Sequence, residues 1–175
     1  MGLRSILSLI LLFSCAQSIA QSLSCPRLPE KYDWKTARDY KRDEELVLRT
    51  LQWLNKTPLN DELVMRSKAN LFVMQWICGS PTLNITIETS SLPFYAEFPD
   101  LLFPYIHGVA QCRLTKNKSC DELKATVNGF NTVAFMIRND DGLRKNKSLQ
   151  TLVKASKKGK MELYVQSLGN KKTDR

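Results

Sequence analysis

The strongest constraint on the fold is an apolar segment, "LFVMQWIC" (71–78), that stops at "GSP". Apolar residues recur at helical spacing here, and the second half of the pattern is apolar on nearly every face. A helix of this kind belongs inside a bundle rather than on its surface. Gly79 fits the left-handed position after a helix C-terminus, and Pro81 follows where a helix does not continue. We therefore expect a central helix that begins at Asn60 or Asp61 and ends at Cys78.

Helical periodicity predicts five other helices around this one. The first begins near Asp39 or Asp43 and ends before Pro58, which cannot continue a helix. Downstream of the central helix, the predicted helices cover residues 100–114, 119–137, 148–156 and 160–168. The second of these opens with Ser119 and Glu122, whose spacing is that of a capping box.

The chain between the helices sets the fold class. Residues 82–88, "TLNITIE", alternate like a strand but have no second strand to pair with, so we expect an extended crossing segment. The aromatic loop that follows, with Phe94, Tyr95 and Phe98, is expected to cover the core.

Gly108 lies within a predicted helix, where glycine costs about 1 kcal/mol of helix stability relative to Ala unless close packing requires it. The prediction is an all-α fold: a compact five- to six-helix bundle of antiparallel hairpins, with an extended N-terminal arm and one extended crossing segment.

The first twenty residues have the pattern of a signal peptide. Arg4 precedes an apolar stretch, and Ser18 and Ala20 supply the small residues of a cleavage site. We expect cleavage before Gln21 and an exported protein, periplasmic or secreted. Acylation of Cys15 is the weaker alternative, because a bulky residue lies two positions before it. No later stretch approaches the roughly 20 apolar residues that span a membrane.

The predicted organisation is a signal peptide (1–20), an extended arm (21–40), a single helical domain (41–168) and a flexible basic tail (169–175).

Four cysteines remain after the predicted cleavage: Cys25, Cys78, Cys112 and Cys120. In an exported chain an even number favours two disulfides, which three connectivities could supply. Cys112 and Cys120 flank a short connection between two predicted helices, so a disulfide that staples these helices together is reasonable. The second disulfide would then join Cys25 to Cys78. Zinc is the weaker alternative, because the chain has no CxxC motif and His107 is its only histidine.

The order of these signals resembles an uncharacterised family of small exported α-helical proteins of Bacteroidota. The residues that carry the resemblance are "RSKANLFVMQWICGSPTLNITI", "DLLFPYIHGVAQCRLTKNKS" and "LQTLVKASKKGKMELYV", and it covers roughly residues 40–166. Trp76, Gly79 and Pro81 fit its junction between a helix and an extended stretch. Three cysteines, Cys78, Cys112 and Cys120, depart from the pattern. The family implies a helical fold and supplies no activity for any residue.

No motif of catalysis or cofactor binding stands out. His107 is the only imidazole available to a Ser-His or Cys-His pair, and a structural hydrogen bond is the more common role for a histidine in an apolar helix. The chain has neither the GxSxG motif nor a glycine-rich phosphate loop. We therefore predict a protein that is not an enzyme, with no catalytic residue, no cofactor and no metal site.

Basic residues gather near the C-terminal end of a chain whose net charge is +9. A cationic face there would attract an anionic glycan, lipopolysaccharide or phosphate, whereas an ordinary solvated surface is the competing interpretation. Nucleic acid is not an expected partner, because interleaved aromatic residues are missing. The residues of the predicted face are Arg144, Lys145, Lys147, Lys154, Lys157, Lys158 and Lys160.

The function predicted from the sequence is that of an exported, non-enzymatic helical protein of the periplasm or cell exterior. Its partner would be an unknown protein or an anionic surface. The alternative, for a eukaryotic source, is a secreted signalling protein like the four-helix cytokines. Four glycosylation sequons favour that alternative, at Asn55, Asn84, Asn117 and Asn146.

Overall fold

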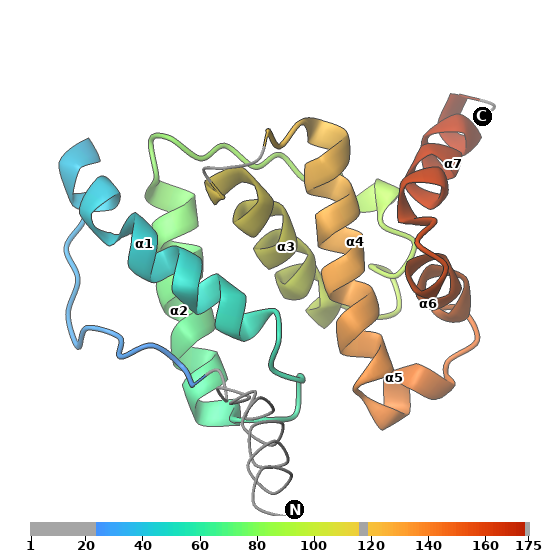
Figure 1. The fold of residues 1–175 in the computed structure, drawn as a ribbon, viewed down its shortest axis with the longest axis horizontal. Helices are drawn as coiled ribbons and strands as arrows, with labels where there is room; N and C mark the ends of the chain where they lie inside the picture. Colours follow the sequence, from blue (N-terminus) through green and yellow to red (C-terminus); the bar gives the residue numbers. More distant parts are fainter. Residues whose placement is uncertain (1–23, 116–118, 174–175) are drawn as a thin grey trace, which may run out of the picture.

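The computed structural model describes residues 24–115 and 119–173. The predicted signal peptide, Cys15 and the sequon at Asn117 lie outside the described residues. The described part contains seven α-helices, two short 3-10 helices and no strand, which confirms the all-α prediction (Figure 1). In chain order the elements are α1 (Ala37–Leu54), α2 (Leu63–Gly79), η1 (Thr89–Ser91), η2 (Pro99–Leu101), α3 (Leu102–Leu114), α4 (Glu122–Arg138), α5 (Asp141–Lys145), α6 (Gln150–Lys157) and α7 (Met161–Thr173). No helix among them is long and apolar enough to cross a membrane.

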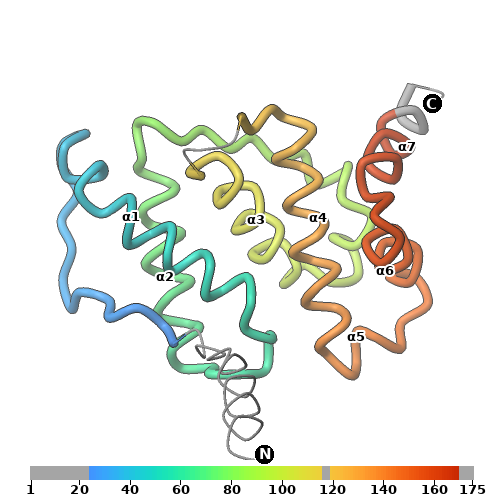
Figure 2. The backbone as a smooth tube through the Cα atoms, viewed as in Figure 1, coloured from blue at the N-terminus to red at the C-terminus, as the bar shows by residue number. Residues whose placement is uncertain are grey.

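Helix α3 stands in the middle of the molecule, between α1 and α2 on one side and α4 on the other (Figures 1 and 2). It is buried on nearly all faces, and every residue from Pro104 to Ala110 is inaccessible to solvent or nearly so. Its two sides face two separate groups of apolar residues. Ile106 and Ala110 face the core of α1 and α2, whereas Tyr105 and Val109 face the core of α4, α6 and α7.

Helices α3 and α4 cross in close contact at two glycines, Gly108 and Gly129. A Cβ atom on Gly108 would lie 2.7 Å from the carbonyl oxygen of Asn128 and 2.8 Å from the Cα of Gly129. A Cβ on Gly129 would lie 2.8 Å from the ring of Tyr105. Asn128 donates a 2.6 Å hydrogen bond from Nδ2 to the carbonyl of Gly108. Close packing therefore requires Gly108, and this contact offsets its low helix propensity.

Helix α1 begins earlier than predicted, because Thr36 caps it. Thr36 and Asp39 form a capping box, in which the Asp39 carboxylate accepts from the backbone N–H of Thr36 at 2.9 Å. These hydrogen bonds hold the pKa of Asp39 below its usual value. The extended arm before the cap packs on α2, where Tyr32 and Trp34 stack on each other and contact the ring of Phe72.

The end of α2 is determined by packing rather than by a left-handed glycine. Trp76 is fully buried, as predicted, and its Nε1 donates to the Tyr40 carbonyl at 3.1 Å. Gly79 is the last residue of α2, and Gly159 is the only glycine with a positive φ in the described chain. A Cβ on Gly79 would lie 2.0 Å from the Tyr40 hydroxyl oxygen. The left-handed assignment of Gly79 is therefore wrong, and the close approach of Tyr40 explains why glycine stands there.

Two predicted helix starts are also wrong. Helix α2 begins after Glu62, which has a left-handed backbone (φ 52°) and makes no side-chain cap, so neither Asn60 nor Asp61 caps it. A non-glycine residue in this conformation costs about 1–2 kcal/mol. Helix α4 begins after Asp121, whose carboxylate accepts from the Lys124 N–H at 2.8 Å, two residues beyond the predicted Ser119.

The C-terminal part contains more helix than predicted. The stretch expected to be only a break after α4 includes the short helix α5, because Asp140 caps it by accepting from the Leu143 N–H at 2.9 Å. Helix α7 continues to Thr173. It therefore includes residues of the predicted tail.

The position of α2 differs most from expectation. The helix lies at an edge of the molecule beside α1 rather than in the middle (Figure 1). Its inner face is buried, but Val64 is 72% exposed and Leu71 57% exposed on its outer face. The rule that an apolar helix is central holds for α3 and fails for α2.

The segments between α2 and α3 follow the prediction. Residues 83–88 are extended and pair with no strand in the described chain. In the loop that follows, Phe94 is buried against the rings of Tyr105 and Phe130. Tyr95 and Phe98 pack half-buried on the same core, so this aromatic loop covers the core as expected.

We expect Gly108→Ala to destabilise the fold by several kcal/mol, although alanine favours helix. Its Cβ would meet backbone atoms of α4, which cannot move without separating the helices. The matched control is Gly169→Ala in α7, where nothing lies within 4 Å of the added atom and the gain in helix propensity is about 1 kcal/mol. Urea denaturation followed by circular dichroism measures both. Equal effects of the two substitutions would contradict the tight crossing.

Candidate functional site

The basic residues predicted to form one surface lie on α5, on α6 and in the connections beside them. Helix α6 is anchored through Leu149, Leu152 and Val153, which are buried in the core shared with α4 and α7. These anchors fix the rotation of α6, so Lys154 and Lys157 point to solvent. We call the set of seven the basic surface; all seven side chains are exposed: Arg144, Lys145, Lys147, Lys154, Lys157, Lys158 and Lys160.

The basic surface has little neutralising charge. The sequence from Gly142 to Lys160 contains seven basic residues and no acidic one. Arg144 pairs with Asp141 at 2.7 Å, whereas the described residues place no carboxylate within ion-pairing distance of the six lysines. Several of these cations also lie in the last turns of α5 and α6, where the helix dipole stabilises positive charge. The surface therefore has a positive potential that is open to solvent.

A second polar feature, buried at Arg66 and His107 and half-buried at its other residues, lies where α1, α2 and α3 meet. We call it the polar layer, and it consists of Asn55, Arg66, His107 and Gln111. Arg66 donates to the carbonyl oxygens of Leu54, at 3.1 Å, and of Thr57, and so satisfies the end of α1. Asn55 donates to Oε1 of Gln111 at 2.6 Å. Burial lowers the pKa of Arg66, and nearby Asp61 offsets part of this change.

His107 lies in this layer with 0% of its surface exposed. Neither ring nitrogen has a hydrogen-bond partner among the described residues, so the predicted structural hydrogen bond is absent. Loss of solvation, together with the positive charge of Arg66, lowers the pKa of His107 from 6.5 to about 3. The ring is neutral at physiological pH and has no contact with solvent, which leaves it poorly placed to exchange a proton with a substrate.

Sequence reasoning missed the polar layer, although one signal for it was present. Arg66 occupies the same helical stripe as Ala69 and Val73, which are both fully buried. A charged residue within a buried stripe indicates that carbonyl groups or a counter-charge lie opposite it. The partners on α1 and α3 come from distant parts of the chain, and the helical pattern does not identify them.

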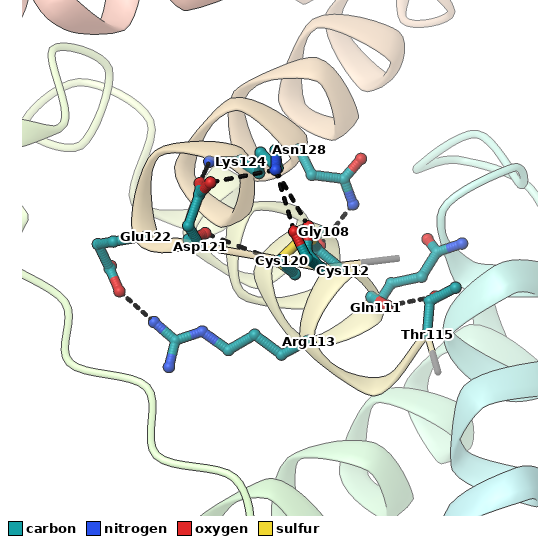
Figure 3. Close-up of a disulfide and its surroundings, with 11 residues drawn as sticks. Gly108, Gln111, Cys112, Arg113, Thr115, Cys120, Asp121, Glu122, Lys124 and Asn128 are labelled. Atoms are coloured by element: carbon teal, nitrogen blue, oxygen red, sulfur yellow. Dashed lines mark hydrogen bonds and ion pairs between the residues drawn. A yellow bond between two sulfur atoms is a disulfide. The ribbon is translucent and has the colours of Figure 1, made fainter. Parts of the chain in front are cut away.

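The predicted staple between α3 and α4 is present. Cys112 and Cys120 form a disulfide at the point where α3 ends and the chain turns back toward α4 (Figure 3). Beside it, Arg113 forms an ion pair with Glu122 and donates to the carbonyl of Asn84. The same corner therefore joins α3, the start of α4 and the extended crossing segment.

The second predicted disulfide is absent, because Cys25 and Cys78 are both free thiols. Cys25 is half-buried near the start of α2, where burial and the charge of Glu62 raise its pKa. Cys78 lies near the other end of the same helix. With a rise of 1.5 Å per residue, the 16 residues from Glu62 to Cys78 span about 24 Å. The arm thus begins at the wrong end of α2 for a bridge to Cys78.

One groove of the described chain combines apolar residues with the carboxylates of Glu88 and Glu122, and its lining contains no histidine or cysteine. The groove between the crossing segment, α4 and α7 is lined by apolar residues such as Phe130 and Leu168, with the hydroxyl-bearing Tyr105 and Thr126. Burial raises the pKa of Tyr105, which disfavours its ionised form. No group of three or more His, Cys, Asp or Glu in the described chain is arranged to hold a metal ion.

The chain matches no protein-family model, no curated protein and no solved structure. These comparisons leave the resemblance to a Bacteroidota family as a prediction, and function is inferred from this chain's own residues.

We expect His107→Leu to raise the free energy of unfolding by about 1 kcal/mol at pH 7, because it removes buried polar atoms without partners. The substitution should also change the pH dependence. Below pH 6.5 the unfolded wild-type chain binds a proton on His107 and the folded chain does not, until the pH approaches 3. Wild type should therefore lose about 2 kcal/mol more than the variant between pH 7 and pH 5. Urea denaturation followed by tryptophan fluorescence measures this, and parallel losses in the two proteins would show that His107 titrates normally.

We expect removal of the Cys112–Cys120 disulfide to destabilise the protein by about 2–3 kcal/mol, the loop-entropy value for a short loop. The test is the double substitution Cys112→Ser and Cys120→Ser, compared with Cys25→Ser and Cys78→Ser as a control that removes two free thiols. Thermal unfolding measures both. A control variant as destabilised as the test variant would show that the two free thiols matter as much as the disulfide.

Proposed function

We propose that this protein is exported, has no catalytic activity, and binds an anionic glycan or lipid surface outside the cytoplasm through the basic surface. The observation that carries the proposal is a run of six exposed lysines with no carboxylate partner in the described residues. The disulfide between Cys112 and Cys120 and the N-terminal signal-like pattern support an oxidising location.

The chemistry of the basic surface favours a surface of repeated negative charges over a small ligand. The lysines lie on an exposed helix and its connections rather than around an enclosed cavity. Lysine ammonium groups act as mobile point charges, whereas recognition of one defined anion commonly uses the rigid fork of arginine. Six of the seven cations are lysines. Binding of this kind depends on charge density and weakens as salt screens the charges.

The burial of the only histidine also supports a binding role rather than a catalytic one. His107, the one imidazole of the chain, is enclosed in the polar layer. The groups that remain available to a partner are therefore on the exterior, where the basic surface is the most concentrated set of one charge.

The proposal is tested by neutralising three lysines of α6, with Lys154, Lys157 and Lys158 each replaced by Gln. An anionic surface contributes roughly 1 kcal/mol per lysine, so we expect binding to heparin and to phosphatidylglycerol vesicles to weaken at least about tenfold. The control variant replaces Lys31, Lys56 and Lys68 by Gln, which lowers the net charge equally from exposed positions elsewhere.

Binding is measured by fluorescence anisotropy for heparin and by co-sedimentation for vesicles, with phosphatidylcholine vesicles as the neutral reference. The heparin and vesicle arms distinguish a glycan from a lipid. If both triple variants lose affinity equally, the net charge of the chain is responsible, and the basic surface is an ordinary solvated face.

A further inference from the structure

The outer face of α2 has a largely exposed, uncharged seam in the described chain. Five residues at alternating spacings of three and four lie on the side of α2 opposite the buried stripe of Arg66 and Ala69; four of them are exposed, and Met74 is half-buried with its side chain packed partly on the core. Val64 is 72% exposed and Leu71 57% exposed. We call this the α2 seam; its residues are Val64, Ser67, Leu71, Met74 and Cys78.

The spacing of the α2 seam is that of a coiled coil. Val64, Leu71 and Cys78 are separated by seven residues and take the first core position of a heptad, and Ser67 and Met74 take the second. When two such helices pair in parallel, each residue of the first position faces the same residue of the partner helix. A β-branched residue such as Val64 at that position favours two-stranded pairing.

Cys78 gives the seam a chemical property that surface leucines lack. It is exposed and has a free thiol, and it is separated from the other free cysteine by the length of α2. The remaining two cysteines are already joined. A thiol left without a partner inside an exported chain is a candidate for pairing between molecules.

We propose that the α2 seam pairs with the same seam of a second copy of this chain, in parallel, and that a disulfide between the two Cys78 residues closes the dimer. Two-fold symmetry places these thiols opposite each other without any further adjustment. This inference goes beyond the binding function proposed above, and it shares with that proposal the location outside the reducing cytoplasm.

Charge explains why a second copy would meet at this face. A chain with net charge +9 repels another copy, so self-association favours a face without charge. The α2 seam contains no ionisable group except the Cys78 thiol. Lys68 flanks the seam, and heptad geometry places Leu63 of the second copy opposite it rather than another cation.

The size of the seam explains why the covalent bond is required. A standard interface uses about 20–30 residues from each partner, and the α2 seam supplies five. Pairing through such a short seam is weak by itself. A disulfide links the two chains covalently and so raises the effective concentration of each helix near the other, which favours their pairing.

The bond forms by exchange with a small-molecule disulfide such as glutathione disulfide. The Cys78 thiolate attacks one sulfur of glutathione disulfide, which releases one glutathione thiolate and leaves a mixed disulfide. The second Cys78 thiolate then attacks the Cys78 sulfur of that mixed disulfide and releases the second glutathione. Two protein thiols are oxidised, one glutathione disulfide is reduced to two thiols, and the two protons pass to glutathione.

The experiment incubates the purified protein with a glutathione redox buffer and separates the products by non-reducing electrophoresis and analytical ultracentrifugation. We expect wild type and Cys25→Ser to form a covalent dimer, and Cys78→Ser to remain monomeric. A second pair of variants tests the geometry. In the Cys78→Ser background, Leu71→Cys should restore the dimer, because the same heptad position faces itself. Leu163→Cys, at a leucine that is 62% exposed on α7, should form at least tenfold less dimer.

Four results would overturn the proposal. The wild type could remain monomeric with glutathione on Cys78, the dimer could form through Cys25, or Cys25 could bridge to Cys78 within one chain. In the fourth, Leu71→Cys and Leu163→Cys would dimerise equally, which would indicate random collision rather than a paired seam. Circular dichroism confirms that each variant is folded before it is scored. None of these outcomes depends on heparin or vesicle binding, so this proposal and the proposed function can fail separately.

Discussion

The contact on which the rest of the structure depends is the crossing of α3 and α4 at Gly108 and Gly129. Two helix backbones can touch only where side chains are missing, and the glycines provide that space at the same level of both helices. The hydrogen bond from Asn128 to the Gly108 carbonyl lies within the crossing, and the disulfide joins the end of α3 to the residue before the cap of α4. With this pair held together, α3 presents one side to each of the two apolar cores.

Features that depend on nearby residues could be predicted from the sequence. The helix class, the burial of Trp76, the staple from Cys112 to Cys120 and the aromatic cover around Phe94 follow from short-range patterns. The helix starts were less accurate, because several residues near each start can act as a cap. Asp121 performs this role in α4 instead of Ser119, and Thr36 performs it in α1.

Features that depend on distant contacts could not be derived in the same way. The place of α2 at the edge follows from what packs against it, and its pattern is similar to that of the central α3. The direction of the arm decides that Cys25 meets the start of α2, and spacing does not reveal that direction. The basic surface could be recognised because its residues all fall within one short stretch of the chain, 144–160. The partners in the polar layer could not, because Arg66 lies on α2, His107 on α3, and Asn55 at the C-cap of α1.

The two proposed binding surfaces lie in different parts of the molecule. The basic surface belongs to α5 and α6, whereas the α2 seam is on the opposite side of the central α3 and α4 (Figure 1). A second copy on the seam would therefore leave both basic surfaces uncovered. A dimer could then contact a charged surface through two basic surfaces at once. It would dissociate only when both basic surfaces are released, so it would stay bound for longer.

The separation of the apolar residues into two cores has a consequence for the motions of the chain. The core of α1 and α2 contains residues of the arm and one side of α3, and the core of α4, α6 and α7 contains the other side. Parts of a protein that are built around separate cores can open as separate cooperative units. Helices α1 and α2 can thus lose their protection against hydrogen exchange together, while α3 remains attached to α4. In such a partial opening, α1 and α2 separate from the rest of the molecule, and the central pair α3 and α4 stays folded.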